Sequence, residues 1–102
     1  MAYEIDYTDL AKADISYISE YLSNFYSGTL ERFLNFYNKR ISILHENPYA
    51  FKVCNFNPQY RQVSVADYIV MYTVNEAVKS VEIYRILHCK RDIERIISEE
   101  YI

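Results

Sequence analysis

Residues 3–7 alternate between apolar and acidic side chains, reading Tyr-Glu-Ile-Asp-Tyr. In an extended backbone successive side chains point to opposite faces, so the aromatic and aliphatic groups fall on one face and the carboxylates on the other. A period of two is typical of a strand with one solvent-exposed face. We therefore expect a first strand over these residues.

Helical spacing replaces the alternation directly after this strand. The apolar residues recur at intervals of four or three, at Ala11, Ile15, Ile18, Leu22 and Phe25. This interval predicts an amphipathic helix of roughly four turns with one apolar face. Thr8 and Asp9 precede the stripe and carry side-chain oxygens that can accept hydrogen bonds from the unpaired N–H groups of a helix start.

A second amphipathic helix is predicted after a break at Ser27-Gly28-Thr29. Gly28 supplies the backbone freedom that a tight reversal needs, and Thr29 is expected to cap the new helix. The apolar stripe of this helix consists of Leu30, Phe33, Leu34, Tyr37, Ile41 and Leu44. Asn47-Pro48 ends it, because proline disfavours the helical conformation of the preceding residue.

The segment between residues 49 and 58 has no regular period. It carries Phe51, Cys54 and Phe56 among polar residues. We expect a loop rich in aromatic residues that docks on the core, with room for a short irregular strand.

The second half of the chain has the pattern of a sheet. Val63 and Val65 alternate with polar residues, as in a half-buried strand, whereas residues 68–74 are almost continuously apolar, as in a central strand covered on both faces. The predicted strands cover residues 60–65, 68–74 and 79–88, with turns at 66–67 and 75–77. Two consecutive hairpins imply that these strands are antiparallel.

A short helix is predicted at the end of the chain, where Asp92 can cap a segment with Ile93, Ile96 and Ile97 on one face and an acidic end at Glu99 and Glu100. The element order is then β-α-α-β-β-β with a short C-terminal helix. Two helical stripes packed against one face of a sheet give an α+β fold of two layers, a helical hairpin on a mostly antiparallel four-stranded sheet. We expect residues 1–102 to form a single domain.

The opposite face of this sheet is expected to be only half covered. Four tyrosines are expected on the strands that form it, namely Tyr60, Tyr68, Tyr72 and Tyr84. They predict a partly apolar surface with many hydroxyl groups, which suits a protein partner.

Composition narrows the class of protein. Of the 102 residues 51% are hydrophobic, and the single Gly and two Pro indicate an ordered globular chain. Two cysteines do not suggest a disulfide framework, and we find neither a secretion signal nor an apolar run long enough for a membrane span. We expect a cytoplasmic protein without membrane contact. The net charge of -3 gives no overall positive field that would attract nucleic acid.

Residues able to bind a metal ion are scattered along the chain, at His45, Cys54, His88 and Cys89. The adjacent pair His88-Cys89 would point to opposite faces of a strand, so no compact ligand set forms. With one glycine the chain has no phosphate-binding loop, and it has no nucleophile-elbow motif. We predict neither a metal ion nor a cofactor.

The densest group of basic residues consists of Arg85, His88, Lys90 and Arg91, and strand pairing could bring Arg61 close to it. Such a cluster could bind phosphate oxygens, because guanidinium groups form bidentate contacts with them. The alternative is that Lys90 and Arg91 form a solvated turn, while Arg85 pairs with a carboxylate of the helices or of a partner. The sequence leaves both interpretations open.

Several segments together resemble the RelE/ParE toxin superfamily. They are the opening Met1-Ala2-Tyr3-Glu4-Ile5, the helix end Leu44-His45-Glu46-Asn47-Pro48, Tyr60-Arg61-Gln62-Val63, residues 68–74, residues 81–88, and Lys90-Arg91-Asp92. The resemblance covers nearly the whole chain, and the order of the segments agrees with the element order predicted above. It implies the toxin of a type II toxin-antitoxin module.

The resemblance offers two modes of action. The RelE-like branch cleaves messenger RNA on the ribosome with basic residues and a tyrosine, whereas the ParE-like branch poisons DNA gyrase. In this chain Ile69 stands where the RelE pattern has an arginine, Val63 replaces one of its two lysines, and Ile97 replaces its late tyrosine. Only Arg61 and Arg91 match. An isoleucine can neither transfer a proton nor stabilise a phosphorane.

The RelE-like catalytic set is incomplete in this chain, and the Arg-Ile-Leu-His stretch at residues 85–88 resembles the ParE-like branch. We therefore favour the ParE-like branch, with gyrase inhibition by binding and no enzymatic activity. A ribonuclease that uses Arg61, His88 and Arg91 is the first alternative, and a degenerate protein that only binds its antitoxin is the second. The residues expected to bind a partner are Tyr72, Arg85, Lys90, Arg91, Ile93 and Ile97. The expected partners are a cognate antitoxin, in a toxin-antitoxin hetero-oligomer, and either gyrase or the ribosome with its message.

Overall fold

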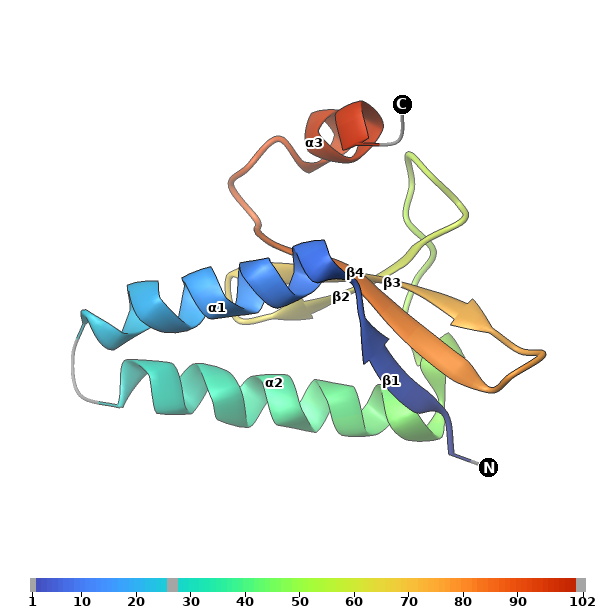
Figure 1. Cartoon of the computed structure of the whole chain (residues 1–102), viewed down its shortest axis with the longest axis horizontal. Coiled ribbons are helices and arrows are strands. Elements are labelled where there is room, and N and C mark those ends of the chain that lie inside the picture. Colours follow the sequence, from blue (N-terminus) through green and yellow to red (C-terminus); the bar gives the residue numbers. More distant parts are fainter. Residues whose placement is uncertain (1, 26–27, 101–102) are drawn as a thin grey trace.

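The elements follow one another in the order that the hydrophobic pattern predicts. The computed structural model describes residues 2–25 and 28–100. Its elements are β1 (Glu4–Tyr7), α1 (Asp9–Ser23), α2 (Thr29–Glu46), the 3-10 turn η1 (Pro48–Ala50), β2 (Arg61–Val65), β3 (Tyr68–Asn75), β4 (Ser80–His88) and α3 (Ile93–Glu100), as Figure 1 shows. The α+β prediction is confirmed. Ser27 of the predicted break and Met1 of the opening motif lie outside the described residues.

The four strands form one mixed sheet in the order β1-β4-β3-β2. The two predicted hairpins are present, with β2 antiparallel to β3 and β3 antiparallel to β4. β1 instead runs parallel to β4, with Ile5 opposite Val81. No hairpin fixes the direction of β1, because two helices and two strands separate it from β4 along the chain.

The helix starts were predicted with mixed success. Thr8 caps α1, since its Oγ1 accepts a hydrogen bond from the Ala11 N–H at 3.1 Å. Asp92 serves α3 in the same way, accepting from the Arg95 N–H at 3.3 Å. The prediction for α2 was wrong, because its cap position is Gly28 and Thr29 is already helical. Gly28 has a φ of 91°, a left-handed conformation that strongly favours glycine, so the reversal ends on this residue.

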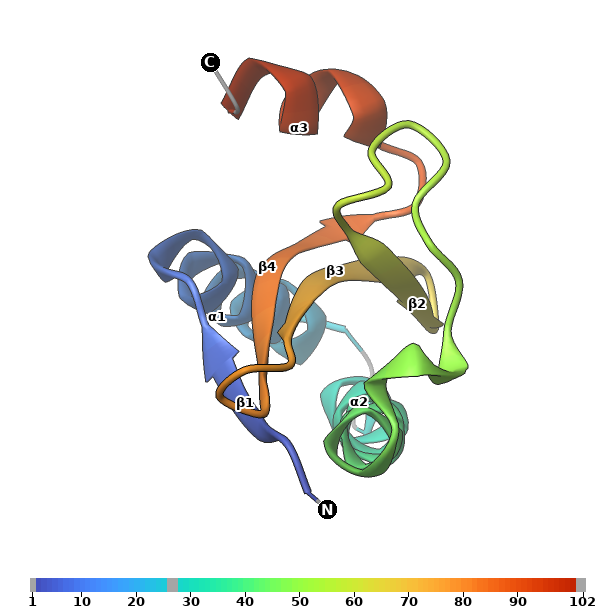
Figure 2. The same cartoon turned by 90° about the vertical axis from the view of Figure 1, so that its right-hand side faces the viewer.

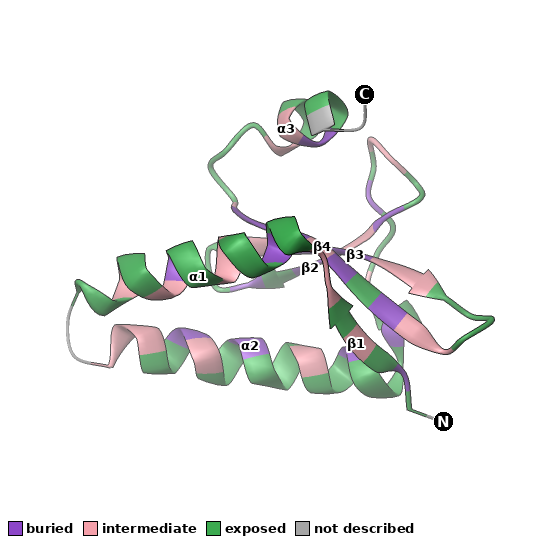
Figure 3. Ribbon diagram, in the orientation of Figure 1, coloured by how far each residue is buried: buried purple, intermediate pink, exposed green. Residues whose placement is uncertain are grey.

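The main core lies between the sheet and the two long helices. Figure 2 shows α1 and α2 on the same face of the sheet, and Figure 3 shows the buried residues on their inner sides. Its buried residues include Ile18, Phe33, Tyr37, Leu44, Val70, Tyr72, Val81 and Ile83. The predicted helical stripes are therefore the ones that pack on the sheet, with Phe25 as an exception that bears on function.

A smaller core covers the opposite face of the sheet. There α3 and the loop after η1 pack on β3 and β4, and the buried residues are Cys54, Tyr60, Met71, Leu87 and Ile97. The loop docks as predicted, and Val53 forms an isolated bridge with Arg61. The expectation of a half-covered face lined by four tyrosines was wrong. Tyr68 and Tyr72 belong to the helix-side core, because alternate residues of β3 point to opposite faces.

No helix within residues 2–25 and 28–100 combines the length and the apolar character that crossing a bilayer would require.

Candidate functional site

An open groove of about 550 Å³ lies where α1 passes the last residues of β4. From α1 it is lined by Asp14, Tyr17, Ile18 and Tyr21, and from the strands and the following turn by Tyr68, Ile86, Leu87, His88 and Arg91. We call it the α1–β4 groove. It combines aromatic rings and aliphatic side chains with a few polar groups, which is the usual composition of a binding site.

The outer side of α1 carries an aromatic stripe beside this groove. Three exposed residues of α1 recur at spacings of seven and four and so share one side of the helix, namely Leu10, Tyr17 and Tyr21, and the exposed Phe25 follows just beyond the helix end. The Tyr17 ring stacks on the Tyr21 ring with a centroid distance of 6.4 Å, and the Tyr21 ring meets the Phe25 ring edge-on at 4.9 Å. Tyr17 is 70% exposed. The stripe is therefore an apolar surface that the core does not use.

Phe25 was predicted to belong to the core stripe and does not. It is 50% exposed and lies just beyond the end of α1 at Ser23. The helical period that relates it to Leu22 no longer holds once the backbone leaves the helix. Phe25 instead extends the outer aromatic stripe.

Side chains of α1 complete the edge of β4 below the groove. β1 ends at Tyr7, opposite Ile83. Beyond that point the Thr8 hydroxyl donates a hydrogen bond to the Tyr84 carbonyl at 2.7 Å, and Asp14 Oδ2 accepts from the Ile86 N–H at 2.9 Å. Beyond the end of β1, these two side chains therefore occupy hydrogen-bonding groups on the edge of β4. Less of that edge is left free to pair with another chain.

The same carboxylate of Asp14 pairs with Arg85. The guanidinium donates from Nε at 2.7 Å to one oxygen and from Nη2 at 2.9 Å to the other, a bidentate contact. Both side chains are nearly buried, with 9% of Arg85 and 13% of Asp14 exposed. This is the helix carboxylate that the sequence left as one alternative for Arg85. The charge of Arg85 is neutralised within the fold, and the residue forms part of the support of the groove.

Two of the other predicted residues lie at the end of the groove. The His88 ring meets the Tyr68 ring edge-on at 5.2 Å, and its Nδ1 accepts a hydrogen bond from the Lys90 N–H at 3.1 Å. Lys90 and Arg91 are exposed in the turn that follows β4. Of these residues, His88 and Arg91 line the groove, and Arg91 brings a positive charge to it.

Arg61 lies far from His88 and Arg91. It is opposite Tyr72 in the sheet, whereas His88 is opposite Tyr68. Four residues of an antiparallel strand span about 13 Å, and β3 also lies between β2, which carries Arg61, and β4, which carries His88. Arg61 Nη1 instead donates to the Phe51 carbonyl at 2.7 Å. The structure brings His88 and Arg91 together and does not bring Arg61 to them.

The remaining predicted partner-binding residues are inside the molecule. Tyr72 has no exposed surface, its hydroxyl donates to the Pro48 carbonyl at 2.7 Å, and burial raises its pKa to about 12. Ile97 is buried and Ile93 half-buried on the inner side of α3. In this conformation the three residues shape the fold beneath the surface. Tyr17 and Tyr21 were missed, although their spacing from Leu10 could have identified the stripe.

Metal-binding residues do not gather in the described part of the chain, where no group of three His, Cys, Asp or Glu side chains could hold an ion. Cys54 is buried under α3, while Cys89 is exposed in the turn after β4. The His45 ring is hydrogen-bonded through Nδ1 to the Tyr3 backbone carbonyl at 2.7 Å. The four candidate ligands therefore occupy separate environments.

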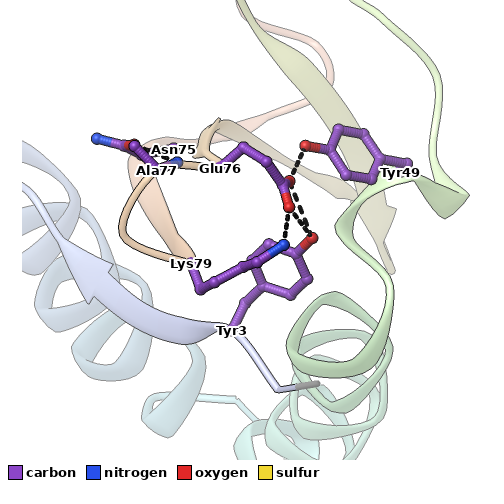
Figure 4. Close-up of polar contacts among 6 residues, drawn as sticks. All are labelled: Tyr3, Tyr49, Asn75, Glu76, Ala77 and Lys79. Atoms are coloured by element: carbon purple, nitrogen blue, oxygen red, sulfur yellow. Dashed lines mark hydrogen bonds and ion pairs between the residues drawn. The ribbon is translucent and has the colours of Figure 1, made fainter.

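A polar cluster lies at the opposite end of the sheet, at the turn between β3 and β4. Figure 4 shows the hydroxyls of Tyr3 and Tyr49 and the ammonium group of Lys79 converging on the Glu76 carboxylate. Hydrogen bonds from Lys79, Tyr49 and Tyr3 lower the pKa of Glu76 to about 2. We call this the Glu76 cluster. It ties the N-terminal segment, η1 and the β3–β4 turn together.

Comparison with known proteins places these features in a family. A family model described as the ParE toxin of the type II toxin-antitoxin system, parDE, matches residues 5–93. A search of the curated proteins gave no match. The chain is similar to several solved structures, among them a chromosomal ParDE system from P. aeruginosa, with 17% identity, coverage of 87% of this chain and 98% of that chain, and a TM-score of 0.68.

Toxins of the RelE type have the same fold. The similarity to the RelBE2 complex from Mycobacterium tuberculosis covers 86% of this chain and 99% of that chain, with 18% identity and a TM-score of 0.59. For a free form of the E. coli toxin RelE the coverage is 100% and 99%, with 17% identity and a TM-score of 0.61. At these identities the structural similarity establishes the shared fold alone.

Proposed function

The chain belongs to the ParE toxin family and is the toxin of a type II toxin-antitoxin system, and from this premise we propose that it acts by binding DNA gyrase and not by cutting RNA. The proposal combines the ParE family assignment with the geometry of the candidate residues. It treats residues 1–102 as one functional domain.

The separation of Arg61 from His88 and Arg91 is the observation that carries the proposal. Acid-base catalysis requires groups within hydrogen-bond reach of one reacting centre, at about 3 Å. Arg61 is held by the Phe51 carbonyl on another strand, well away from the other two residues. Ile97, which stands where a RelE-like toxin has its tyrosine, is buried on the inner side of α3. This arrangement favours a toxin that acts by binding.

The α1–β4 groove is the contact surface in this proposal. Tyr17 and Tyr21 offer rings with a polar hydroxyl, a side-chain type that is enriched where protein interfaces have most of their binding energy. Arg91 adds a positive charge in the groove and Lys90 another in the exposed turn that follows β4, which suits a partner with acidic residues. We assign the contact with gyrase to the groove and to the turn at residues 89–92.

The antitoxin is proposed to occupy the same groove. An amphipathic segment with acidic residues could place apolar side chains on the aromatic stripe and carboxylates near Arg91. A segment that is disordered when free suits this role, because folding upon binding allows a short chain to cover a large surface. Occupation of the groove would then exclude gyrase, and this exclusion is how the toxin would be neutralised.

The test is a DNA cleavage assay with purified gyrase, supercoiled plasmid and the toxin without antitoxin. The proposal predicts that cleaved DNA accumulates in a complex with gyrase as the toxin is added. A translating extract provides the comparison, and the message should remain intact in it. Codon-dependent cleavage of the message that Arg91→Ala abolishes, together with unaffected gyrase, would establish the ribonuclease alternative. If the folded toxin is harmless in its host and inactive in both assays, it is a degenerate antitoxin-binding protein.

A further inference from the structure

The charges of the chain are distributed unevenly. Residues 32–63 contain five cations, Arg32, Lys39, Arg40, Lys52 and Arg61, against the single carboxylate of Glu46, which gives a net charge of +4. The rest of the chain contains six cations and thirteen carboxylates, a net charge of -7. The overall charge of -3 therefore conceals a basic segment that the sequence analysis did not identify.

The fold gathers this segment on one side of the molecule. In Figure 2, η1 and the loop after it run from the end of α2 to the strand β2. The Arg61 guanidinium donates to the Phe51 carbonyl at 2.7 Å and lies 5.1 Å from the centre of the Tyr49 ring. The Arg40 guanidinium lies 5.8 Å from the centre of the Phe51 ring. Cations and aromatic rings thus alternate continuously from α2 to β2.

One further contact extends this surface. On α2, the Lys39 ammonium lies 6.0 Å from the centre of the exposed Phe36 ring. Lys52 lies outside this surface, because its neighbour Val53 pairs with Arg61 and successive side chains of an extended segment point to opposite faces. We call the surface formed by Phe36, Lys39, Arg40, Tyr49, Phe51 and Arg61 the basic aromatic face.

The positive charge of this face is not compensated. Among the residues that the structure describes, Lys39, Arg40 and Arg61 pair with no carboxylate, whereas ion pairs engage Lys79, Arg85 and Arg95. Uncompensated cations repel one another within a folded protein, so a bound polyanion would be favourable here. The negative charge of the rest of the molecule would repel a polyanion. The protein would therefore approach such a ligand with the basic aromatic face first.

We infer that the basic aromatic face binds single-stranded nucleic acid. The guanidinium groups of Arg40 and Arg61 suit phosphate oxygens, which they can contact in a bidentate manner. The exposed rings of Phe36 and Tyr49 offer faces on which unpaired bases can stack. An acidic peptide would use the charges alone, whereas a polynucleotide uses both the charges and the rings. The inference does not depend on gyrase binding, because this face is formed by α2, η1 and β2 and the groove by α1 and β4.

The experiment measures fluorescence anisotropy of labelled oligothymidylate and oligouridylate of about 20 nucleotides, longer than one typical binding site. Salt is varied between about 50 and 200 mM, because each phosphate contact contributes about -0.7 to the slope of log K against log salt for single strands. Binding of either oligonucleotide with a slope of about -2 or steeper is expected for three or more contacts. Preference for one of the two identifies the nucleic acid as DNA or RNA.

Two charge-matched double variants localise the binding. Arg40→Gln with Lys39→Gln should weaken binding at low salt by at least about tenfold and flatten the slope by about 1.4, since two phosphate contacts are lost. Lys12→Gln with Arg95→Gln changes the net charge equally on α1 and α3 and should leave the affinity within about twofold, because these residues lie away from the face. Neither Arg40 nor Lys39 makes a side-chain hydrogen bond within the described structure, so thermal denaturation should show both proteins folded.

A third variant separates stacking from charge. Phe36→Leu removes an exposed ring without changing any charge and should weaken binding by about fivefold or more. Equal losses in the two double variants would overturn the inference in favour of a nonspecific charge effect. Binding of an oligoglutamate peptide that depends on Lys39 and Arg40, with no binding of either oligonucleotide, would also overturn it and assign the face to an acidic protein.

Discussion

The tyrosines at the two ends of the sheet have different roles. At the β3–β4 turn, the hydroxyls of Tyr3 and Tyr49 bind the Glu76 carboxylate and hold three segments of the chain together. At the α1–β4 groove, the rings of Tyr17 and Tyr21 stack on each other at the surface and contribute little to the core. The first pair has a structural explanation within the chain. Tyr17 and Tyr21 have no such structural explanation within the described residues. For this reason we assign them to the contact with a partner.

The largest effect is expected from Asp14→Ala, which removes the support of the groove. The nearly buried Arg85 would lose its bidentate partner and the Ile86 N–H its acceptor. Breaking a buried ion pair from one side destabilises a protein by about 3–5 kcal/mol. Urea denaturation measures the loss. Glu20→Ala, an exposed carboxylate on the same helix, should change the free energy of unfolding by less than about 0.5 kcal/mol. Similar values for the two variants would contradict the structural role of Asp14.

Next in size is the effect of truncating the aromatic stripe. Each of Tyr17→Ala and Tyr21→Ala should weaken partner binding by about 2 kcal/mol, a factor of about 30, if the groove holds the central contacts of an interface. The free energy of unfolding should change by less than about 0.5 kcal/mol, because both rings lie at the surface. Titration calorimetry with gyrase measures the first quantity and urea denaturation the second. Loss of stability without loss of affinity would make the stripe structural.

A smaller effect is expected for a buried tyrosine. Tyr72→Phe removes the hydrogen bond to the Pro48 carbonyl and leaves that acceptor without its partner, which should destabilise the fold by about 1–2 kcal/mol. Tyr17→Phe provides the control, because its hydroxyl is in solvent and its removal should leave the free energy of unfolding unchanged. The contrast fails if the two substitutions have the same effect on the urea midpoint.

The smallest effect concerns pH at the Glu76 cluster. Its hydrogen bonds lower the pKa of Glu76 from 4.5 to about 2. Because the folded pKa is the lower one, the folded state favours the carboxylate, and this stabilisation is complete above pH 4.5 and disappears as the pH falls towards 2. The stability difference between wild type and Glu76→Gln should therefore shrink over this range. Urea denaturation at several pH values tests this, and a constant difference would show that Glu76 does not titrate as described.

Local patterns of the sequence predicted most of the elements. These patterns relate residues that are close in the sequence, so spacing alone predicts their effect. They include the helical stripes around Ile18 and Tyr37, the alternation in the strands, and the capping oxygens of Thr8 and Asp92. The cap of α2 could not be assigned in this way. The sequence predicted Thr29 as the cap, whereas the cap position is Gly28, because the reversal imposes a left-handed backbone angle on that residue.

Contacts between distant segments could not be predicted. The partner of Arg85 was open because Asp14 is 71 residues away in the sequence. The sequence suggested a cluster of Arg61 with His88 and Arg91, because all three are basic and pairing between their strands could bring them close together. The register places Arg61 opposite Tyr72, four residues along β3 from the Tyr68 that pairs with His88, and beside Phe51 and Tyr49. For the same reason the basic aromatic face became visible only in the folded chain.

Gyrase-dependent DNA cleavage by wild type and by a Tyr17→Ser/Tyr21→Ser variant tests the central claim most directly. The account predicts that wild-type toxin accumulates cleaved plasmid, while the variant, with an unchanged urea midpoint, requires a concentration at least about 30-fold higher. A stable variant as potent as the wild type would show that the α1–β4 groove is not the contact surface. Absence of cleavage at a large excess of wild-type toxin would contradict gyrase as the target.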